Sequence, residues 1–162
     1  MLERIFPRQF DNNYRGHWLG LVIFVVVIAL KAVQCIESVV NTRETAVRAD
    51  GIDLASFSTA GADTVLSMFA LLGLYLLVIP AQSIVVLVRY RSMIPLMYFW
   101  LLLLQIASRA LHMLHPAFAA EADAPHPIGF YVNLGIMAVT VIGFVLSIVG
   151  PRYAAKPPNV EA

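Results

Sequence analysis

Four stretches of the chain are each long and apolar enough to cross a lipid bilayer, and no other feature constrains the fold as strongly. A membrane-spanning helix needs about 20 mostly apolar residues. The four stretches cover residues of about 18–40, 64–88, 93–114 and 128–149. They predict an all-α integral membrane protein, a bundle of four antiparallel transmembrane helices.

The composition agrees with a membrane protein and excludes a soluble domain. Of the 162 residues, 60% are hydrophobic and only 13% are charged, whereas soluble domains average about 45–50% apolar and about 25% charged residues. The net charge of +1 provides no general attraction to nucleic acid, so we expect no nucleic-acid partner. Cys35 is the only cysteine, which excludes an intramolecular disulfide and a cysteine zinc site.

The distribution of lysine and arginine between the connecting segments predicts the orientation of the bundle. Positive residues accumulate in cytoplasmic loops. Seven of them lie in the N-terminal arm, the turn near residue 90 and the C-terminal tail: Arg4, Arg8, Arg15, Arg89, Arg91, Arg152 and Lys156. The loop at 41–63 has two, and the loop at 115–127 has none. We therefore expect both termini in the cytoplasm and a location in a bacterial inner (plasma) membrane.

These boundaries divide the chain into three parts. Residues 1–17 are expected to form a cytoplasmic or interfacial arm, residues 18–150 the transmembrane domain, and residues 151–162 a flexible cytoplasmic tail. Tyr14 and Trp18 have the amphipathic rings that gather at membrane surfaces, so we expect both in an aromatic belt.

The loop at 41–63 is the longest connection and contains a second helical pattern. Residues 42–50 have helical composition and Gly51 is a natural stop. We expect the first helix to project past the bilayer by about two turns. Leu54 and Phe57 would then dip into the membrane surface.

Polar side chains form one stripe on the first helix and one on the third, both in the outer half of the bundle. Charge inside hydrocarbon is costly, so ionisable residues within a span are the default candidates for a functional site. With the acid at the outer end of the second helix, they define a predicted outer cluster: Lys31, Gln34, Glu37, Asp63, Gln105, Arg109 and His112.

We expect this outer cluster to be charge-neutral, with Arg109 paired to Glu37 or Asp63, because a guanidinium group can hold a carboxylate with two hydrogen bonds. Two interpretations stay open. The cluster is a structural network that fixes which helices pair, or it lines an outward-facing cavity for a ligand. The structural interpretation is favoured, because no motif specifies chemistry and no catalytic residue is predicted.

Three histidines on the outer side are weak candidates for a metal site. His112 and His115 are one helical turn apart, and His126 follows on the same side of the membrane. Histidines at outer helix ends are common without metal, so we expect neither a metal nor a cofactor.

The fourth helix carries a stripe of small and polar residues that is typical of helix packing. Asn133, Thr140 and Ser147 recur every seven residues, with Gly143 on the same face. Small residues let membrane helices approach closely, and hydroxyl or amide groups bond across them.

These features predict a small structural or accessory subunit of a membrane complex or homo-oligomer. Its partners would be the lipid bilayer and other membrane subunits or further copies of itself. The alternative is a carrier or membrane enzyme for a small or lipidic ligand, which would use the outer cluster.

Overall fold

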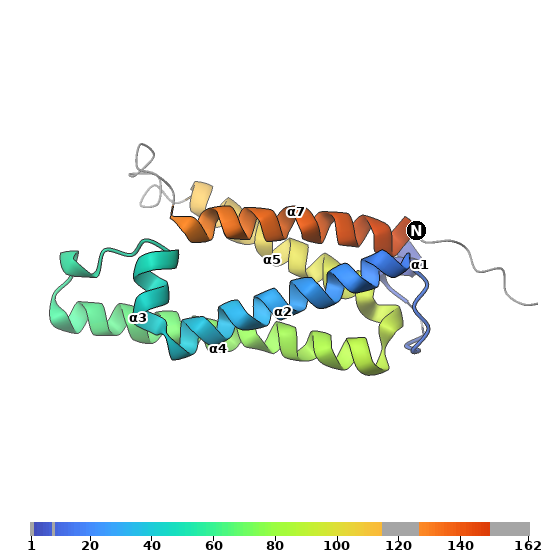
Figure 1. Cartoon of the computed structure of the whole chain (residues 1–162), viewed down its shortest axis with the longest axis horizontal. Coiled ribbons are helices and arrows are strands. Elements are labelled where there is room, and N and C mark those ends of the chain that lie inside the picture. Colours follow the sequence, from blue (N-terminus) through green and yellow to red (C-terminus); the bar gives the residue numbers. More distant parts are fainter. Residues whose placement is uncertain (1, 8, 115–126, 150–162) are drawn as a thin grey trace, which may run out of the picture.

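The computed structural model describes residues 2–7, 9–114 and 127–149, and the regular structure in these ranges is helical (Figure 1). Four helices are long and apolar enough to cross a membrane. They are α2 (Trp18–Val40), α4 (Thr59–Arg89), α5 (Ile94–Leu114) and α7 (Ile128–Val149), and the short α1 (Leu2–Ile5) precedes them. The prediction of an all-helical fold with four helices that are long and apolar enough to cross a membrane is confirmed.

Helix α4 begins at Thr59, earlier than the sequence predicts, because Ser58 caps it. The Ser58 hydroxyl oxygen accepts a hydrogen bond from the backbone N–H of Gly61 at 3.2 Å. With 31 residues at about 1.5 Å each, α4 exceeds the roughly 30 Å of bilayer hydrocarbon. Its first turns extend beyond the ends of α5 and α7 (Figure 1).

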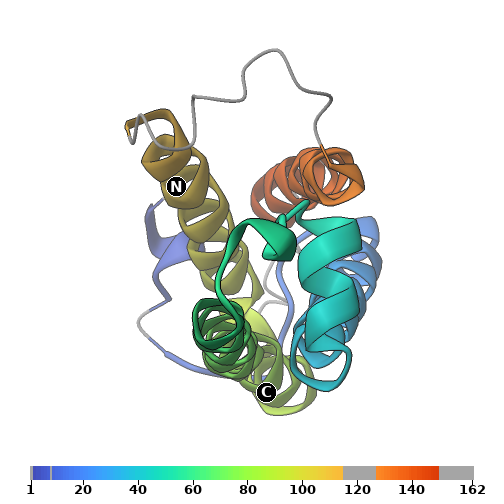
Figure 2. The ribbon, with the colours of Figure 1, turned by 90° about the vertical axis from the view of Figure 1, so that its left-hand side faces the viewer.

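Helix α2 is the central element of the bundle. It packs extensively against α4 and α7, and α7 also packs against α5 (Figures 1 and 2). The core gathers where these helices meet, and Phe24 of α2 and Tyr98 of α5 are both fully buried there. Their ring centroids are 5.1 Å apart in an edge-to-face contact. Helices α2 and α7 therefore pack against each other, α4 is held by α2, and α5 is held by α7.

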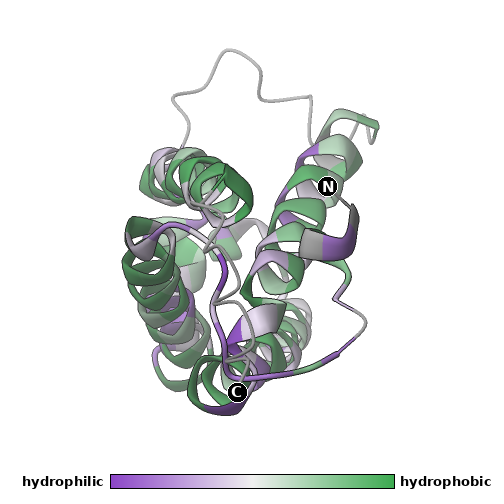
Figure 3. Ribbon diagram, turned by 90° about the vertical axis from the view of Figure 1, so that its right-hand side faces the viewer, coloured by the Kyte–Doolittle hydropathy of each residue, from purple (hydrophilic) through white to green (hydrophobic). Residues whose placement is uncertain are grey.

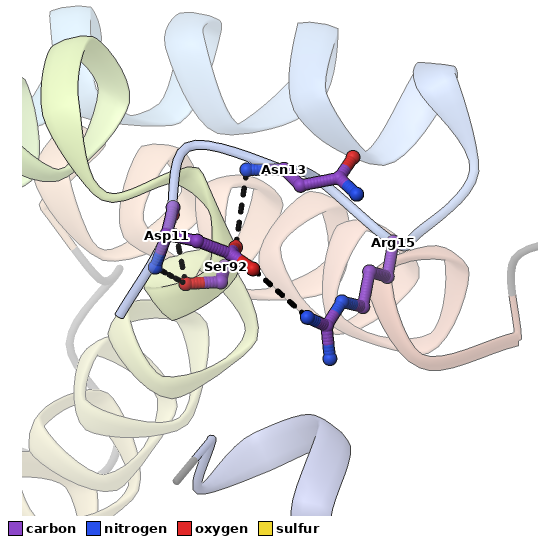
Figure 4. A network of polar contacts seen from close by, with 4 residues as sticks. All are labelled: Asp11, Asn13, Arg15 and Ser92. Carbon is purple, nitrogen blue, oxygen red and sulfur yellow. Dashed lines mark hydrogen bonds and ion pairs between the residues drawn. The ribbon is translucent and has the colours of Figure 1, made fainter. Parts of the chain in front are cut away.

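The N-terminal arm is fastened to one end of the bundle, which we call the arm end. Ser92, in the turn between α4 and α5, donates its hydroxyl to the Asp11 carbonyl oxygen at 2.9 Å and accepts from the Asp11 N–H at 3.0 Å (Figure 4). The Asp11 carboxylate accepts from the backbone N–H of Asn13 and pairs with Arg15 at 2.9 Å. The arm is thus a folded cover on the bundle.

The side chain of Tyr14 lies inside this cover, which corrects its expected place in an aromatic belt. Its hydroxyl is buried beside Gly16 and Gly20 and has no hydrogen-bond partner among the described residues. Burial raises the pKa of Tyr14 to about 12. Trp18, in contrast, is 65% exposed at the start of α2. The chain buries Tyr14 because the His17 N–H bonds to the Leu146 carbonyl and draws the arm onto α7.

At the opposite end, which we call the loop end, the first helix does not project two turns further as expected. It stops at Asn41, and a short α-turn, α3 (Thr42–Glu44), and a π-helix (Thr45–Ala49) follow in a new direction (Figure 1). The Ile52 N–H bonds back to the Ala46 carbonyl. Gly51, with φ of +70°, allows this reversal, so it does end the helical segment.

The reversal also changes the position of the two apolar residues that follow. Leu54, in the 3-10 turn Leu54–Ser56, is buried in the protein. It therefore does not dip into the membrane surface as expected. Phe57 is 46% exposed. The side chain of Ala46 is fully buried, which fixes the loop against the bundle. The Ala46 carbonyl accepts a hydrogen bond from the Ile52 N–H, which keeps the following residues close to it.

The long helices place apolar side chains outward and small polar ones inward. The outward faces carry exposed leucine, isoleucine, valine and methionine, and the ribbon is mostly hydrophobic along α2, α4 and α7 (Figure 3). Ser83, Thr140 and Ser147 are buried. An outer surface of this kind is suited to lipid rather than water.

Two glycines on α7 give a matched test of the packing. A side chain at Gly143 would collide with the Tyr98 hydroxyl, whereas nothing lies within 4 Å of the same position at Gly135. We expect Gly143→Ala to destabilise the bundle by about 1–3 kcal/mol through overpacking. Gly135→Ala should be neutral or stabilising by up to about 1 kcal/mol. Thermal unfolding in one detergent measures both, and equal effects would contradict the contact.

Candidate functional site

Lys31, a half-buried residue of α2, forms the first of three polar links between helices. Its ammonium donates to Gln34 Oε1 at 3.0 Å and to Asn133 Oδ1 at 2.9 Å. Asn133 belongs to α7, so this cation joins two helices through amide oxygens. Among the residues that the structure describes, no carboxylate forms an ion pair with Lys31.

A second link joins α5 to α7 about two helical turns along the bundle. The Gln105 amide nitrogen lies 3.5 Å from the Thr140 hydroxyl oxygen. That hydroxyl donates its own proton to the Ile136 carbonyl at 2.6 Å, so it acts as the acceptor for Gln105. Gln105 Oε1 is buried and has no partner in the described part of the chain. This link is therefore weaker than the one at Lys31.

A third link joins α5 to α2, and sequence reasoning missed it. The Tyr98 hydroxyl donates to the Gly20 carbonyl oxygen at 2.7 Å. Gly143 of α7 faces the same hydroxyl. A larger residue at this position would collide with the Tyr98 ring. A tyrosine within a span was the available signal, since a buried phenol needs a hydrogen-bond partner.

These three links form what we call the polar seam, and each pair among α2, α5 and α7 shares one of them. The residues of the polar seam are Gly20, Lys31, Gln34, Tyr98, Gln105, Asn133 and Thr140. The seam unites part of the predicted outer cluster with part of the predicted packing stripe on α7. Gly143 and Ser147, the other members of that stripe, are also buried.

Arg109 lies apart from the polar seam and does not form the pair that the sequence predicts. Its guanidinium carbon is 4.9 Å from the centroid of the Phe130 ring on α7, a cation–π contact. Neither Glu37 nor Asp63 makes an ion pair with it. The physical reason is the order of helices. Helix α5 packs mainly on α7 and has little contact with α4, which carries Asp63, or with α2, which carries Glu37.

Both acids of the predicted outer cluster lie on exposed surfaces. Glu37 is exposed on α2 and accepts a hydrogen bond from the Asn41 amide at 2.6 Å. Asp63 is exposed on α4, in the turns that extend beyond the bundle. The structure therefore does not bring the predicted cluster together as one charge-neutral group.

The three histidines that the sequence offers as metal candidates have no described side chains. His115 and His126 lie outside the described residues, and so does the side chain of His112. Among the side chains that the structure does describe, no three histidine, cysteine or acidic groups are close enough to hold a metal ion.

A cavity lies at the arm end, away from Lys31. It has a volume of about 30 Å³, and its walls include Arg15, Ser92 and Ser147. Pockets that bind small organic ligands measure roughly 300–1,000 Å³. This hollow is therefore suited to water rather than to an organic ligand.

Comparison with known proteins assigns no family, since no family model, curated protein or solved structure matches this chain. The geometry of the polar seam is thus the basis for a functional proposal.

The link between Lys31 and Asn133 predicts a measurable coupling. Lys31→Met and Asn133→Leu should each destabilise the bundle, and the double variant should cost less than their sum. Hydrogen bonds within membranes couple helices by about 0.6–2 kcal/mol. The matched control is Lys31→Met with Gln105→Leu, which share no hydrogen bond and should be additive within about 0.5 kcal/mol. Additivity for Lys31 and Asn133 would contradict the link.

Proposed function

We propose that this chain is a structural or accessory membrane protein, an antiparallel four-helix bundle that works within a larger membrane complex or a homo-oligomer. The observation that carries the proposal is the use of the core polar groups. The three links at Lys31, Tyr98 and Gln105 each join a different pair of helices. Polar side chains that bond to a neighbouring helix fix which helices pair, and this is the role expected of them in a structural protein.

The surroundings of Lys31 support this role over ligand binding. Two of its three donor hydrogens already bond to amide oxygens of the protein. A ligand would have to replace those bonds, and the small cavity at the arm end lies elsewhere. The preorganised open pocket of a carrier would instead leave such donors facing free space.

One observation favours the alternative, a carrier or membrane enzyme for a small anionic or lipidic ligand. Lys31 and Arg109 both lie in membrane-length helices, and neither forms an ion pair with a described carboxylate. Unpaired cations in a low-dielectric region attract anions strongly.

Purified variants distinguish the two roles. For a scaffold, Lys31→Gln should lower the unfolding temperature clearly, and mass spectrometry of the native protein should find no stoichiometric small molecule. Arg43→Gln, a change at an exposed loop cation, is the control and should leave stability unchanged. A ligand near one per chain, lost in Lys31→Gln or Arg109→Gln at near-normal stability, would establish the alternative.

We further propose that both termini face the cytoplasm of a bacterial inner membrane. The excess of basic residues in the arm, the turn at 90–93 and the tail supports this orientation. Two hydrogen bonds give independent support. Ser92 holds Asp11, and Leu146 holds His17, so the arm, the turn and the end of α7 meet at one end of the bundle.

Fusion tags test this orientation directly. A reporter placed after Ala162 should be active in the cytoplasm, and a tag inserted at Gly51 should be labelled from outside intact cells. The reason is the unequal distribution of positive residues between the two ends. Labelling of the Gly51 tag only after the cells are permeabilised would reverse the orientation.

A further inference from the structure

Helix α4 presents two polar side chains on its outward face. Tyr75 is 68% exposed, and Gln82, seven residues later, is also exposed. Neither side chain makes a hydrogen bond within the part of the chain that the structure describes. The opposite face of α4 packs on α2, where Gly73 meets Ser38.

Both side chains lie at depths where lipid offers no hydrogen-bond partner. Gln82 is seven residues from the end of α4 at Arg89, and Tyr75 is fourteen residues from it. These separations correspond to about 10 Å and about 21 Å along the helix. With Arg89 at the boundary of a hydrocarbon layer of about 30 Å, both polar groups lie within that layer. An unsatisfied amide there is costly, so a partner outside this chain is expected.

The residues around them are spaced as in a helix that packs along its length. Exposed side chains alternate at three and four residues along this face: Met68, Leu71, Tyr75, Val78, Gln82 and Val85. Two helices with apolar residues at such spacing interlock, and polar residues within the row set their register. We call these six residues the α4 stripe.

We propose that the α4 stripe is the interface between two copies of this chain, related by a two-fold axis along the membrane normal, with their Gln82 side chains bonded to each other. A carboxamide is both donor and acceptor, so two identical ones at the axis satisfy each other reciprocally. The two Tyr75 hydroxyls have the same property. This self-complementarity favours a second copy over a different partner. The inference rests on the proposed structural role and specifies its oligomer.

Disulfide crosslinking in the membrane tests the interface. In a Cys35→Ala background, Val78→Cys and Val85→Cys should give covalent dimers on mild oxidation. The matched control is Ile84→Cys, since Ile84 is 53% exposed on the other side of α4. This control should stay monomeric. Dimers formed through Ile84, or through the open face of α7 at Gly135, would overturn the proposal.

A second variant tests the amide pair itself. Gln82→Leu should weaken dimerisation in lipid bilayers by about three- to thirty-fold, and Gln82→Asn should retain most of it. Neither change touches the core, so the unfolding temperature of the monomer should be unchanged. A monomeric wild-type chain in bilayers, or stripe cysteines that crosslink only to another polypeptide, would overturn the proposal. The coupling of Lys31 to Asn133 is measured separately, so a failed dimer leaves the structural role intact.

Discussion

The hydrocarbon core of a bilayer offers no hydrogen-bond partners, and the architecture of this protein follows from that constraint. Backbone amides must be satisfied within each segment, which makes the four spans helical. The same constraint acts on side chains, so those of Lys31, Tyr98 and Gln105 reach across to other helices. The hydrophobic effect does not hold membrane helices together, since lipid tails are as apolar as leucine. Such links and close packing therefore fix the arrangement.

A glycine and a tyrosine together bring three of the long helices into contact. The ring of Tyr98 fits because Gly143 has no side chain, and its hydroxyl then reaches the Gly20 carbonyl. The contact joins α2, α5 and α7 near the arm end. Gly73 has the corresponding role for α4, which lies close to α2 at Ser38. Small residues thus decide how near the helices come, and polar groups decide which helices bond.

Two cations on the long helices, Lys31 and Arg109, contact amide oxygens and an aromatic ring rather than carboxylates. Lys31 bonds to two amide oxygens, and Arg109 lies over Phe130. The exposed positions of Glu37 and Asp63 keep those acids out of the interior. A neutral amide costs less to bury than a carboxylate, so this solution limits the desolvation penalty. Gln82 differs from these groups, because its amide is exposed on the outward face of α4 and makes no hydrogen bond within the described part of the chain.

The sequence by itself determined the class, because apolar length alone decides whether a segment can cross a bilayer. Helical periodicity also placed Lys31 and Gln34 on one face and Asn133 and Thr140 on another. Only the tertiary structure decided which faces meet. It put α5 against α7, so Arg109 contacts Phe130 instead of an acid. It also buried the Tyr14 hydroxyl between the arm and the start of α2. Those outcomes depend on contacts between residues far apart in the chain, which no local pattern encodes.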